Sequence, residues 1–170
     1  MQKLLHVSAV IDRVTAFIGH HVRWLILAAV IVSAVNAIIR KTFDTSSNAW
    51  LELQGLLFGA VFMFAAAYVL QKNGHVRIDA VSSHFSKRTR DWIDLFGHLF
   101  FLLPLCTLMV WIGIPYFWEA YRSNEGSTNA GGLLVWPLKF CVAGGFALLL
   151  AQAISEIIKR VAVLRGLRHD

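Results

Sequence analysis

Four long apolar runs fill more than half of this 170-residue chain and decide which solvent it folds in. As an α-helix rising 1.5 Å per residue, the run over residues 49–70 is about 33 Å long, which matches a bilayer hydrocarbon core of about 30 Å. Hydrophobic residues make up 57% of the chain, more than the core of a soluble domain of this length requires. The sequence therefore predicts an all-α integral membrane protein with a single membrane domain over residues 1–170. Its four transmembrane helices are expected at about residues 24–39, 49–70, 93–117 and 133–158.

The basic residues are unevenly distributed about these spans. Of the 16 Lys and Arg residues, twelve lie in the N-terminal segment, in the loop between the second and third spans and after the fourth span. The positive-inside rule then predicts that both termini and this loop are cytoplasmic, an N-in/C-in topology. The net charge of +6 is explained by this topology and by contact with anionic membrane lipids, so we expect no nucleic-acid partner.

Two further helices are expected at the membrane surface. Over residues 4–18, apolar side chains recur at spacings of three and four with charged residues on the other faces, which is typical of an amphipathic helix. This N-terminal helix either lies along the cytoplasmic interface or packs on a partner helix, and the flanking charges favour the interface. A shorter apolar pattern at residues 78–85, bracketed by basic residues, predicts a short interfacial helix in the cytoplasmic loop.

Small and helix-breaking residues indicate how the spans pack. Gly144 and Gly145 in the fourth span allow another helix to approach closely. Pro104 and Pro115 lie inside the third span, where kinks are expected because proline cannot donate a backbone hydrogen bond. Both cysteines fall within spans, away from any CxxC spacing, and are expected to be buried as small apolar residues.

A few polar residues lie inside or at the edges of the spans, where an ionisable side chain needs a partner. Arg40 ends the first span and Glu52 begins the second across a short turn, so an ion pair between them is feasible. Lys139 enters from the same side and is a competing partner for Glu52. A structural clamp is favoured over a substrate or ion ligand, because a transport path needs polar groups at mid-membrane. Asn36 is the deepest of these residues and is interpreted as an interhelical hydrogen-bonding group.

The sequence contains no arrangement typical of catalysis. It has no HExxH motif, phosphate-binding glycine loop or Ser/His/Asp arrangement, so we expect no enzyme activity and no catalytic, cofactor-binding or metal-binding residues. One alternative stays open, because His20 or His21 and His98 lie near the same membrane face and two imidazoles can hold a b-type haem. The chain would then be a haem-binding membrane anchor of a redox complex. A lone small transporter forming its own pore is poorly supported, since the spans supply few polar residues at mid-membrane.

Three short motifs carry a family resemblance. They are Asn36-x3-Arg40, then Asn48-Ala49-Trp50-Leu51-Glu52-Leu53-Gln54, and Asn73-Gly74-His75-Val76-Arg77-Ile78-Asp79 directly after the second span. With them the chain resembles, over nearly its whole length, the small permease subunit (DctQ type) of tripartite ATP-independent periplasmic (TRAP) transporters. Many members carry two adjacent acids after the tryptophan, whereas Glu52 is followed here by Leu53. Residues 129–133 and 136–139, with the polar Gln152 and Glu156 further along the fourth span, look like the branch associated with keto acids and other organic acids.

The resemblance implies a sodium-driven secondary transporter in the bacterial inner membrane. A periplasmic solute-binding protein would deliver an organic acid to a large multi-span permease subunit, which would move it by an elevator mechanism. This chain would be the scaffold of the large subunit and a docking edge for the binding protein. Sodium coupling would belong to the large subunit, so no cofactor is expected here. The structural or partner-interface candidates are Asn36, Arg40, Trp50, Glu52, His75, Arg77, Asp79 and Lys139.

Overall fold

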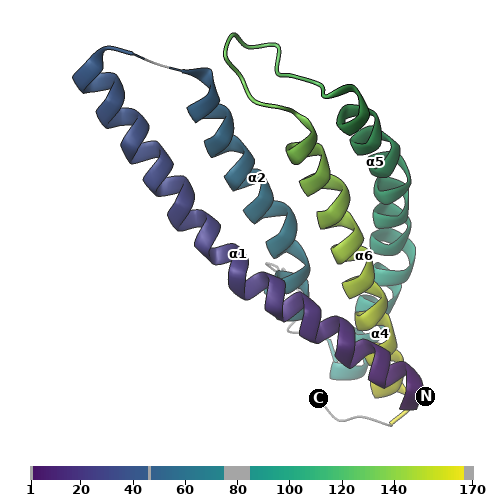
Figure 1. Cartoon of the computed structure of the whole chain (residues 1–170). Helices are drawn as coiled ribbons and strands as arrows, with labels where there is room; N and C mark the ends of the chain where they lie inside the picture. Colours follow the sequence, from purple (N-terminus) through teal and green to yellow (C-terminus); the bar gives the residue numbers. More distant parts are fainter. Residues whose placement is uncertain (1, 46, 75–84, 167–170) are drawn as a thin grey trace.

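The computed structural model describes residues 2–45, 47–74 and 85–166 of the chain. These residues form α1 (Gln2–Phe43), α2 (Asn48–Gln71), α4 (Lys87–Gly97), the π-helical turn η1 (His98–Leu102), α5 (Leu103–Ser123) and α6 (Trp136–Leu164) (Figure 1). Because α4, η1 and α5 follow one another without a break, the described chain has four helical runs long and apolar enough to cross a membrane. Those residues include no β-strand. The prediction of an all-α chain with four spanning helices is confirmed.

The central helix of the fold is α6. It packs against α2 on one side and α5 on the other, while α1 packs against α2 and crosses α6 near the chain termini (Figure 1). The short α4 and η1 also pack on α6. The order α1–α2–α6–α5 is an open layer rather than a closed bundle. Most of the exposed large apolar side chains therefore belong to the two outer runs, α1 and α4–η1–α5.

The N-terminal amphipathic segment does not form a separate surface helix. Residues 4–18 continue into the first span as one 42-residue helix, because no proline interrupts them and Gly19 lets α1 approach the Tyr68 ring of α2 closely. The apolar stripe of residues 4–18 is mostly exposed. The face that α1 buries instead repeats every seven residues and consists of Ser8, Thr15, Val22, Ala29 and Asn36.

The expected close approach at the paired glycines of α6 is confirmed. A Cβ atom on Gly145 would lie 2.6 Å from the Met63 Cβ and 3.0 Å from the Met63 backbone of α2. On the other side of α6, Ala143 lies 3.4 Å from where a Gly113 Cβ would be. Small residues thus bring α2 and α5 close to α6, where van der Waals packing holds membrane helices together.

The third span changes its helical geometry just before Pro104. The Leu103 N–H donates to the His98 carbonyl, five residues earlier, and Pro104 itself has no N–H to continue the α-helical pattern. The sequence predicted a kink at Pro104, and the structure shows a π-helical turn directly before it. Pro115 lies inside α5. The two cysteines, Cys106 and Cys141, are buried free thiols, as expected.

The fourth helix begins three residues later than predicted. Residues 133–135 belong to the loop before α6, where the Ser127 N–H donates to the Leu133 carbonyl at 2.9 Å and the Val135 N–H donates to the Glu125 carbonyl at 2.9 Å. Pro137 then occupies the first turn of α6, a position at which its missing N–H has no helical partner to lose.

Candidate functional site

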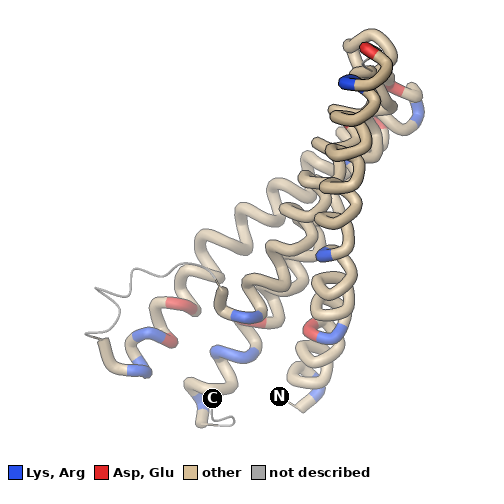
Figure 2. The backbone as a smooth tube through the Cα atoms, turned by 90° about the vertical axis from the view of Figure 1, so that its left-hand side faces the viewer, with Lys and Arg blue, Asp and Glu red and all other residues tan. Residues whose placement is uncertain are grey.

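Charged residues lie mainly towards the two ends of the helices (Figure 2). On α1, the exposed Arg23 lies between these ends, 11 residues after Asp12 and 17 before Arg40. No Asp, Glu, Lys or Arg occurs over residues 24–39, 53–71, 95–118 or 140–155. The group at the loop end, here called the loop cluster, consists of Glu52, Glu125, Ser127, Asn129, Leu133 and Lys139. The group at the end near the chain termini, here called the terminal cluster, consists of Ser8, Asp12, Gln71, Gln152, Ser155, Glu156 and Lys159.

The length of α2 gives the distance between the two clusters. Glu52 and Gln71 lie near its opposite ends, about 28 Å apart at 1.5 Å per residue. This distance is close to the hydrocarbon thickness of about 30 Å. The spacing of the two clusters therefore matches the thickness of the hydrocarbon core of a bilayer.

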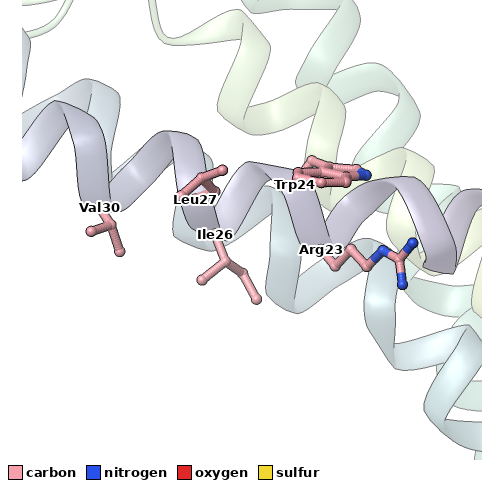
Figure 3. Close-up of a pocket in the computed structure, with 5 residues that line it drawn as sticks. All are labelled: Arg23, Trp24, Ile26, Leu27 and Val30. Carbon is pink, nitrogen blue, oxygen red and sulfur yellow. The ribbon is translucent and has the colours of Figure 1, made fainter.

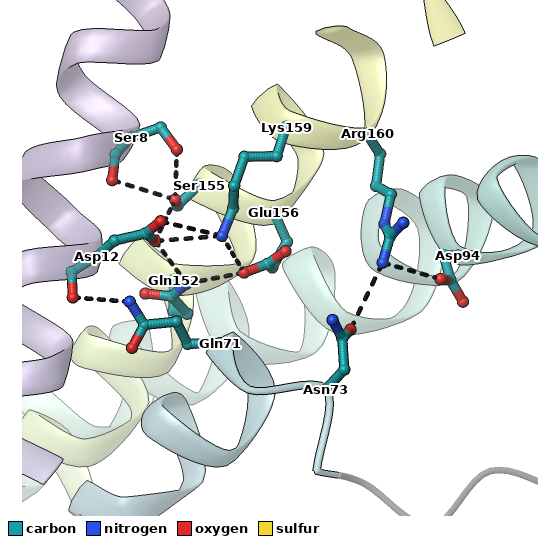
Figure 4. A network of polar contacts seen from close by, with 10 residues as sticks. All are labelled: Ser8, Asp12, Gln71, Asn73, Asp94, Gln152, Ser155, Glu156, Lys159 and Arg160. Carbon is teal, nitrogen blue, oxygen red and sulfur yellow. Dashed lines mark hydrogen bonds and ion pairs between the residues drawn. The ribbon is translucent and has the colours of Figure 1, made fainter. Parts of the chain in front are cut away.

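Asp12 of α1 is the centre of the terminal cluster (Figure 4). Its carboxylate accepts hydrogen bonds from the Gln152 amide at 2.9 Å and the Ser155 hydroxyl at 2.8 Å, and it forms an ion pair with Lys159 at 3.1 Å. Its backbone carbonyl accepts from the Gln71 amide at 2.8 Å. One residue thus joins α1 to both α6 and α2.

The α6 side of the terminal cluster is strongly buried. Gln152 and Ser155 are fully buried and Glu156 is 5% exposed. The Lys159 ammonium group lies 2.5 Å from Glu156 as well as bonding Asp12, and the Gln152 amide donates to both carboxylates. Because a buried charge without partners is costly, these shared hydrogen bonds make the cluster a rigid joint between α1 and α6.

A second joint next to the terminal cluster holds α4 on α6. The Arg160 guanidinium forms ion pairs with Asp91 at 2.7 Å and Asp94 at 3.4 Å. It also donates to the Asn73 side-chain oxygen, just after α2, at 3.5 Å (Figure 4). Neighbouring residues of α6 therefore bind different elements, since Lys159 bonds α1 and Arg160 bonds α4.

Glu52 organises the loop cluster. Its carboxylate accepts from the Ser127 hydroxyl, from the Asn129 amide at 2.8 Å and from the Leu133 backbone N–H at 2.7 Å. These three donors come from one loop between α5 and α6. The start of α2 thereby folds this loop over the end of the helical layer. The neighbouring Asn48 side chain adds a hydrogen bond to the Ala130 carbonyl at 3.0 Å.

Lys139 forms the other contact of the loop cluster. Its ammonium group lies 2.5 Å from the Glu125 carboxylate and 3.9 Å from the centre of the Tyr116 ring. The lysine is 7% exposed, so a carboxylate and an aromatic face replace water around the cation. This contact ties α6 to α5 and to the start of the loop.

No group of three or more His, Cys, Asp and Glu side chains among the described residues could hold a metal ion. Outside the two clusters, the surface is mainly apolar. A shallow groove on the outside of α1 is lined by Arg23, Trp24, Ile26, Leu27 and Val30 (Figure 3).

Comparison with known proteins identifies the family. The family described as tripartite ATP-independent periplasmic transporters, DctQ component, matches residues 27–163. The chain belongs to this family. No curated protein and no solved structure matches the chain. As a DctQ component, it is a multi-pass small membrane subunit of a TRAP transporter, and its family consists of transporter components rather than enzymes.

The ion pair considered between Arg40 and Glu52 of this DctQ chain is not formed. Arg40 is exposed at the end of α1 and has no ion pair among the described residues, whereas the Glu52 carboxylate is occupied by the loop. Lys139 does not compete for Glu52 either, because it bonds Glu125. The loop supplies three neutral donors to Glu52, and its Ser127 gave no sequence signal as a partner.

The remaining candidates have different surroundings. Asn36 is buried on the α1 face, and its side-chain oxygen has no hydrogen-bond partner in the described residues. Trp50 is half-buried in the first turn of α2. The other three candidates and nearly all of the predicted interfacial helix over 78–85 lie outside the described residues. Those three candidates are His75, Arg77 and Asp79.

The histidines proposed as haem ligands make local contacts. His20 and His21 each donate from Nδ1 to a carbonyl of their own helix, to Ala16 and Phe17 respectively, at 2.8 Å. These bonds explain how two adjacent histidines are accommodated on exposed turns of α1. The DctQ match supports the transporter interpretation over the redox anchor.

Sequence reasoning named Gln152 and Glu156 as polar residues of the fourth span but missed the α1 side of the terminal cluster. Asp12 was placed only on the polar side of an amphipathic helix, and Ser8 was not singled out. A signal was present, since Ser8 and Thr15 interrupt the apolar sequence seven residues apart and the same register continues to Asn36. A repeat of seven places small and polar residues on one face, which is the face that packs on a neighbouring helix.

Proposed function

We propose that this DctQ chain is the static scaffold of a sodium-driven TRAP transporter in the bacterial inner membrane. In this proposal a periplasmic solute-binding protein delivers an organic acid to the large permease subunit. The large subunit moves the solute by an elevator mechanism and holds the sodium ions. The small subunit carries no cofactor and widens the immobile part of the assembly.

One observation supports the scaffold role above others: the polar side chains that join helices lie at the two ends, and between them the exposed Arg23 is the one charged residue of the described spans. Asp12, Glu52 and Lys139 each bond residues from other elements. A substrate path would need polar groups at mid-membrane. A rigid support needs fixed helix ends and an apolar outer surface, which this chain supplies.

The proposed topology places the terminal cluster at the cytoplasmic face and the loop cluster at the periplasmic face. The distribution of Lys and Arg supports this orientation. Single cysteines at Ser123 and at Arg165, in a chain with Cys106 and Cys141 replaced by alanine, test it. A membrane-impermeant maleimide should label the first in intact spheroplasts and the second only after permeabilisation, and the reverse order would contradict the topology.

The scaffold role is tested by removing the chain from the complete transporter. The solute is first identified as the organic acid that raises the melting temperature of the cognate binding protein. Uptake of that acid by proteoliposomes, with the binding protein and a sodium gradient present, is then measured for the large subunit with and without this chain. We expect uptake only with both subunits and the gradient. Full uptake by the large subunit alone would contradict the scaffold proposal.

The same preparation distinguishes the redox alternative. A purified transporter complex should contain the large subunit and show no haem absorption. A Soret band that disappears in a His98→Ala chain would instead support a haem anchor.

A further inference from the structure

Helix α1 carries a second seven-residue repeat that this chain leaves uncovered. It begins at Val10 and runs through Phe17, Trp24 and Ile31 to Ile38. Their exposed fractions are 48%, 65%, 59%, 53% and 63% respectively. This series is here called the α1 seam.

The seam lies on the far side of α1 from its buried face. The buried series begins at Ser8 and the seam at Val10, two residues later. Two residues turn an α-helix by about 200°, so the two series stay on nearly opposite sides. A parallel series containing Val7, Val14 and Val35 is also exposed and lies three or four residues from the seam positions. Together they give the alternating spacing of three and four that packs two helices along a common seam.

The acyl chains of the bilayer can cover only part of the exposed apolar surface of α1. At 1.5 Å per residue the 42 residues of α1 extend about 63 Å, twice the hydrocarbon thickness of about 30 Å. Asp12 lies level with Gln71 at the end of α2, where its carbonyl accepts the Gln71 amide. Val7 and Val10 lie beyond that level and are half-exposed. Acyl chains do not reach that far, so the apolar surface that continues there needs another cover.

The charges on α1 indicate the chemistry of that cover. Its one acidic side chain, Asp12, faces α6 in the terminal cluster. Every other charged residue of the helix is basic and lies on an exposed part of its surface. These residues are Lys3, Arg13, Arg23, Arg40 and Lys41. A partner that follows α1 along its length must therefore offer acidic or hydrogen-bond-accepting groups near both ends of the apolar stretch and beside Arg23.

We propose that the α1 seam is the docking surface for one long helix of the large permease subunit. The inference rests on the proposed function and specifies which face of the scaffold is covered. The partner helix carries an apolar stripe with the same three-and-four spacing and acidic side chains near Arg13 and Lys41, which each follow a seam residue by three positions. The two helices cross at about 20° as a left-handed pair, the geometry that a seven-residue repeat imposes.

The flank of α1 next to the seam supplies matched controls at the same depth. Figure 3 shows Trp24 on one side of the helix and Ile26 and Val30 on the other. Val30 is 55% exposed, comparable with Ile31 at 53%. Val30 and Ile31 are thus nearly equal in exposed fraction and in position along α1. They differ only in the direction in which their side chains leave the helix. Trp111 on α5, 79% exposed, serves as a control on the opposite edge of the layer.

The test places a photoreactive benzoylphenylalanine at Phe17, Trp24 or Ile31, and at Val30 or Trp111 as controls, in the chain co-expressed with its large subunit. Illumination of membranes should cross-link the seam positions to the large subunit and the controls only to lipid. Cross-links to the large subunit from the controls but not from the seam would overturn the inference. So would seam cross-links only to a second copy of this chain. If no large subunit co-purifies with the unmodified chain, the proposed function itself fails.

A second measurement follows the assembly of this chain with the large subunit and needs no photoreactive residue. Phe17→Ala combined with Ile31→Ala should reduce the large subunit recovered with the tagged chain by about tenfold, equivalent to about 1.4 kcal/mol. Ile26→Ala combined with Val30→Ala should leave recovery unchanged. Equal recovery of both double variants, each inserted at the wild-type level, would contradict docking at the seam.

Discussion

The Asp12 carboxylate and the Lys159 ammonium group, 3.1 Å apart, connect the first helix of this chain to the last. These residues are separated by most of the sequence, and Lys159 also bonds Glu156 on its own helix. The contact fixes the N-terminal quarter of α1 against α6. It holds the amphipathic segment, which is the beginning of the 42-residue α1, on α6.

Replacing Asp12 with alanine should weaken this joint. The Gln152 amide and the Ser155 hydroxyl would lose their acceptor, and Lys159 would keep only Glu156. We expect a loss of about 2 kcal/mol, discounted from a fully buried pair because Asp12 is partly exposed. This corresponds to a fall of roughly 4–8 °C in melting temperature for a chain of this size.

The melting temperature is measured in mild detergent, with two controls. Asp12→Asn keeps an acceptor oxygen for Gln152 and Ser155 and should lose less than Asp12→Ala. Glu119→Ala removes an exposed carboxylate of α5 and should change little. A melting temperature for Asp12→Ala equal to that of Glu119→Ala would show that the cluster does not hold α1.

Glu52→Gln should loosen the loop between α5 and α6. With the glutamine oxygen facing Ser127 and Asn129, its NH2 group faces the Leu133 N–H, which is also a donor. The Leu133 hydrogen bond is then lost. Hydrogen–deuterium exchange should speed up at Leu133 and at Ser127, whose N–H donates to the Leu133 carbonyl. Unchanged exchange at both amides, judged against Glu119→Gln, would argue against a role for Glu52 in this loop.

Gly145→Ala should separate α2 from α6. Its Cβ would lie 2.6 Å from the Met63 Cβ and 3.0 Å from the Met63 backbone, and a backbone contact is relieved only by moving a helix. Overpacking of this kind costs about 1–3 kcal/mol. Gly55→Ala is the matched control, because nothing lies within 4 Å of its added Cβ and alanine favours a helix by roughly 0.5–1 kcal/mol. The two variants should therefore shift thermal stability in opposite directions.

Arg40→Ala should slow transport without reducing the yield of the complex. Arg40 is exposed at the loop end of α1 and makes no ion pair with the described residues. In the proposed topology this end faces the binding protein, and removal of an exposed charge lowers the association rate more than the stability. Uptake is measured at limiting binding protein, with Lys87→Ala at the opposite end as the control. A wild-type rate for Arg40→Ala would exclude this residue from docking.

The sequence by itself determined the solvent, the number of spans and the family. Apolar runs of sufficient length leave few alternatives, because a backbone crossing a bilayer must satisfy its hydrogen bonds within helices. The paired glycines at 144 and 145 also predicted a close contact between helices, because the sequence shows directly where a side chain is missing. The motifs around Trp50 and Glu52 supported the DctQ assignment before any geometry was known.

Only the tertiary structure decided which polar groups meet. Proximity in sequence suggested Arg40 for Glu52, but the loop following α5 supplies Ser127, Asn129 and the Leu133 amide instead. Asp12 forms an ion pair with Lys159 because α1 crosses α6 near the chain termini. Hydrogen bonds act over about 3 Å, whereas sequence patterns specify only the face of a helix on which a side chain lies. The partners of a polar group are therefore set by how the helices cross, which no single helix encodes.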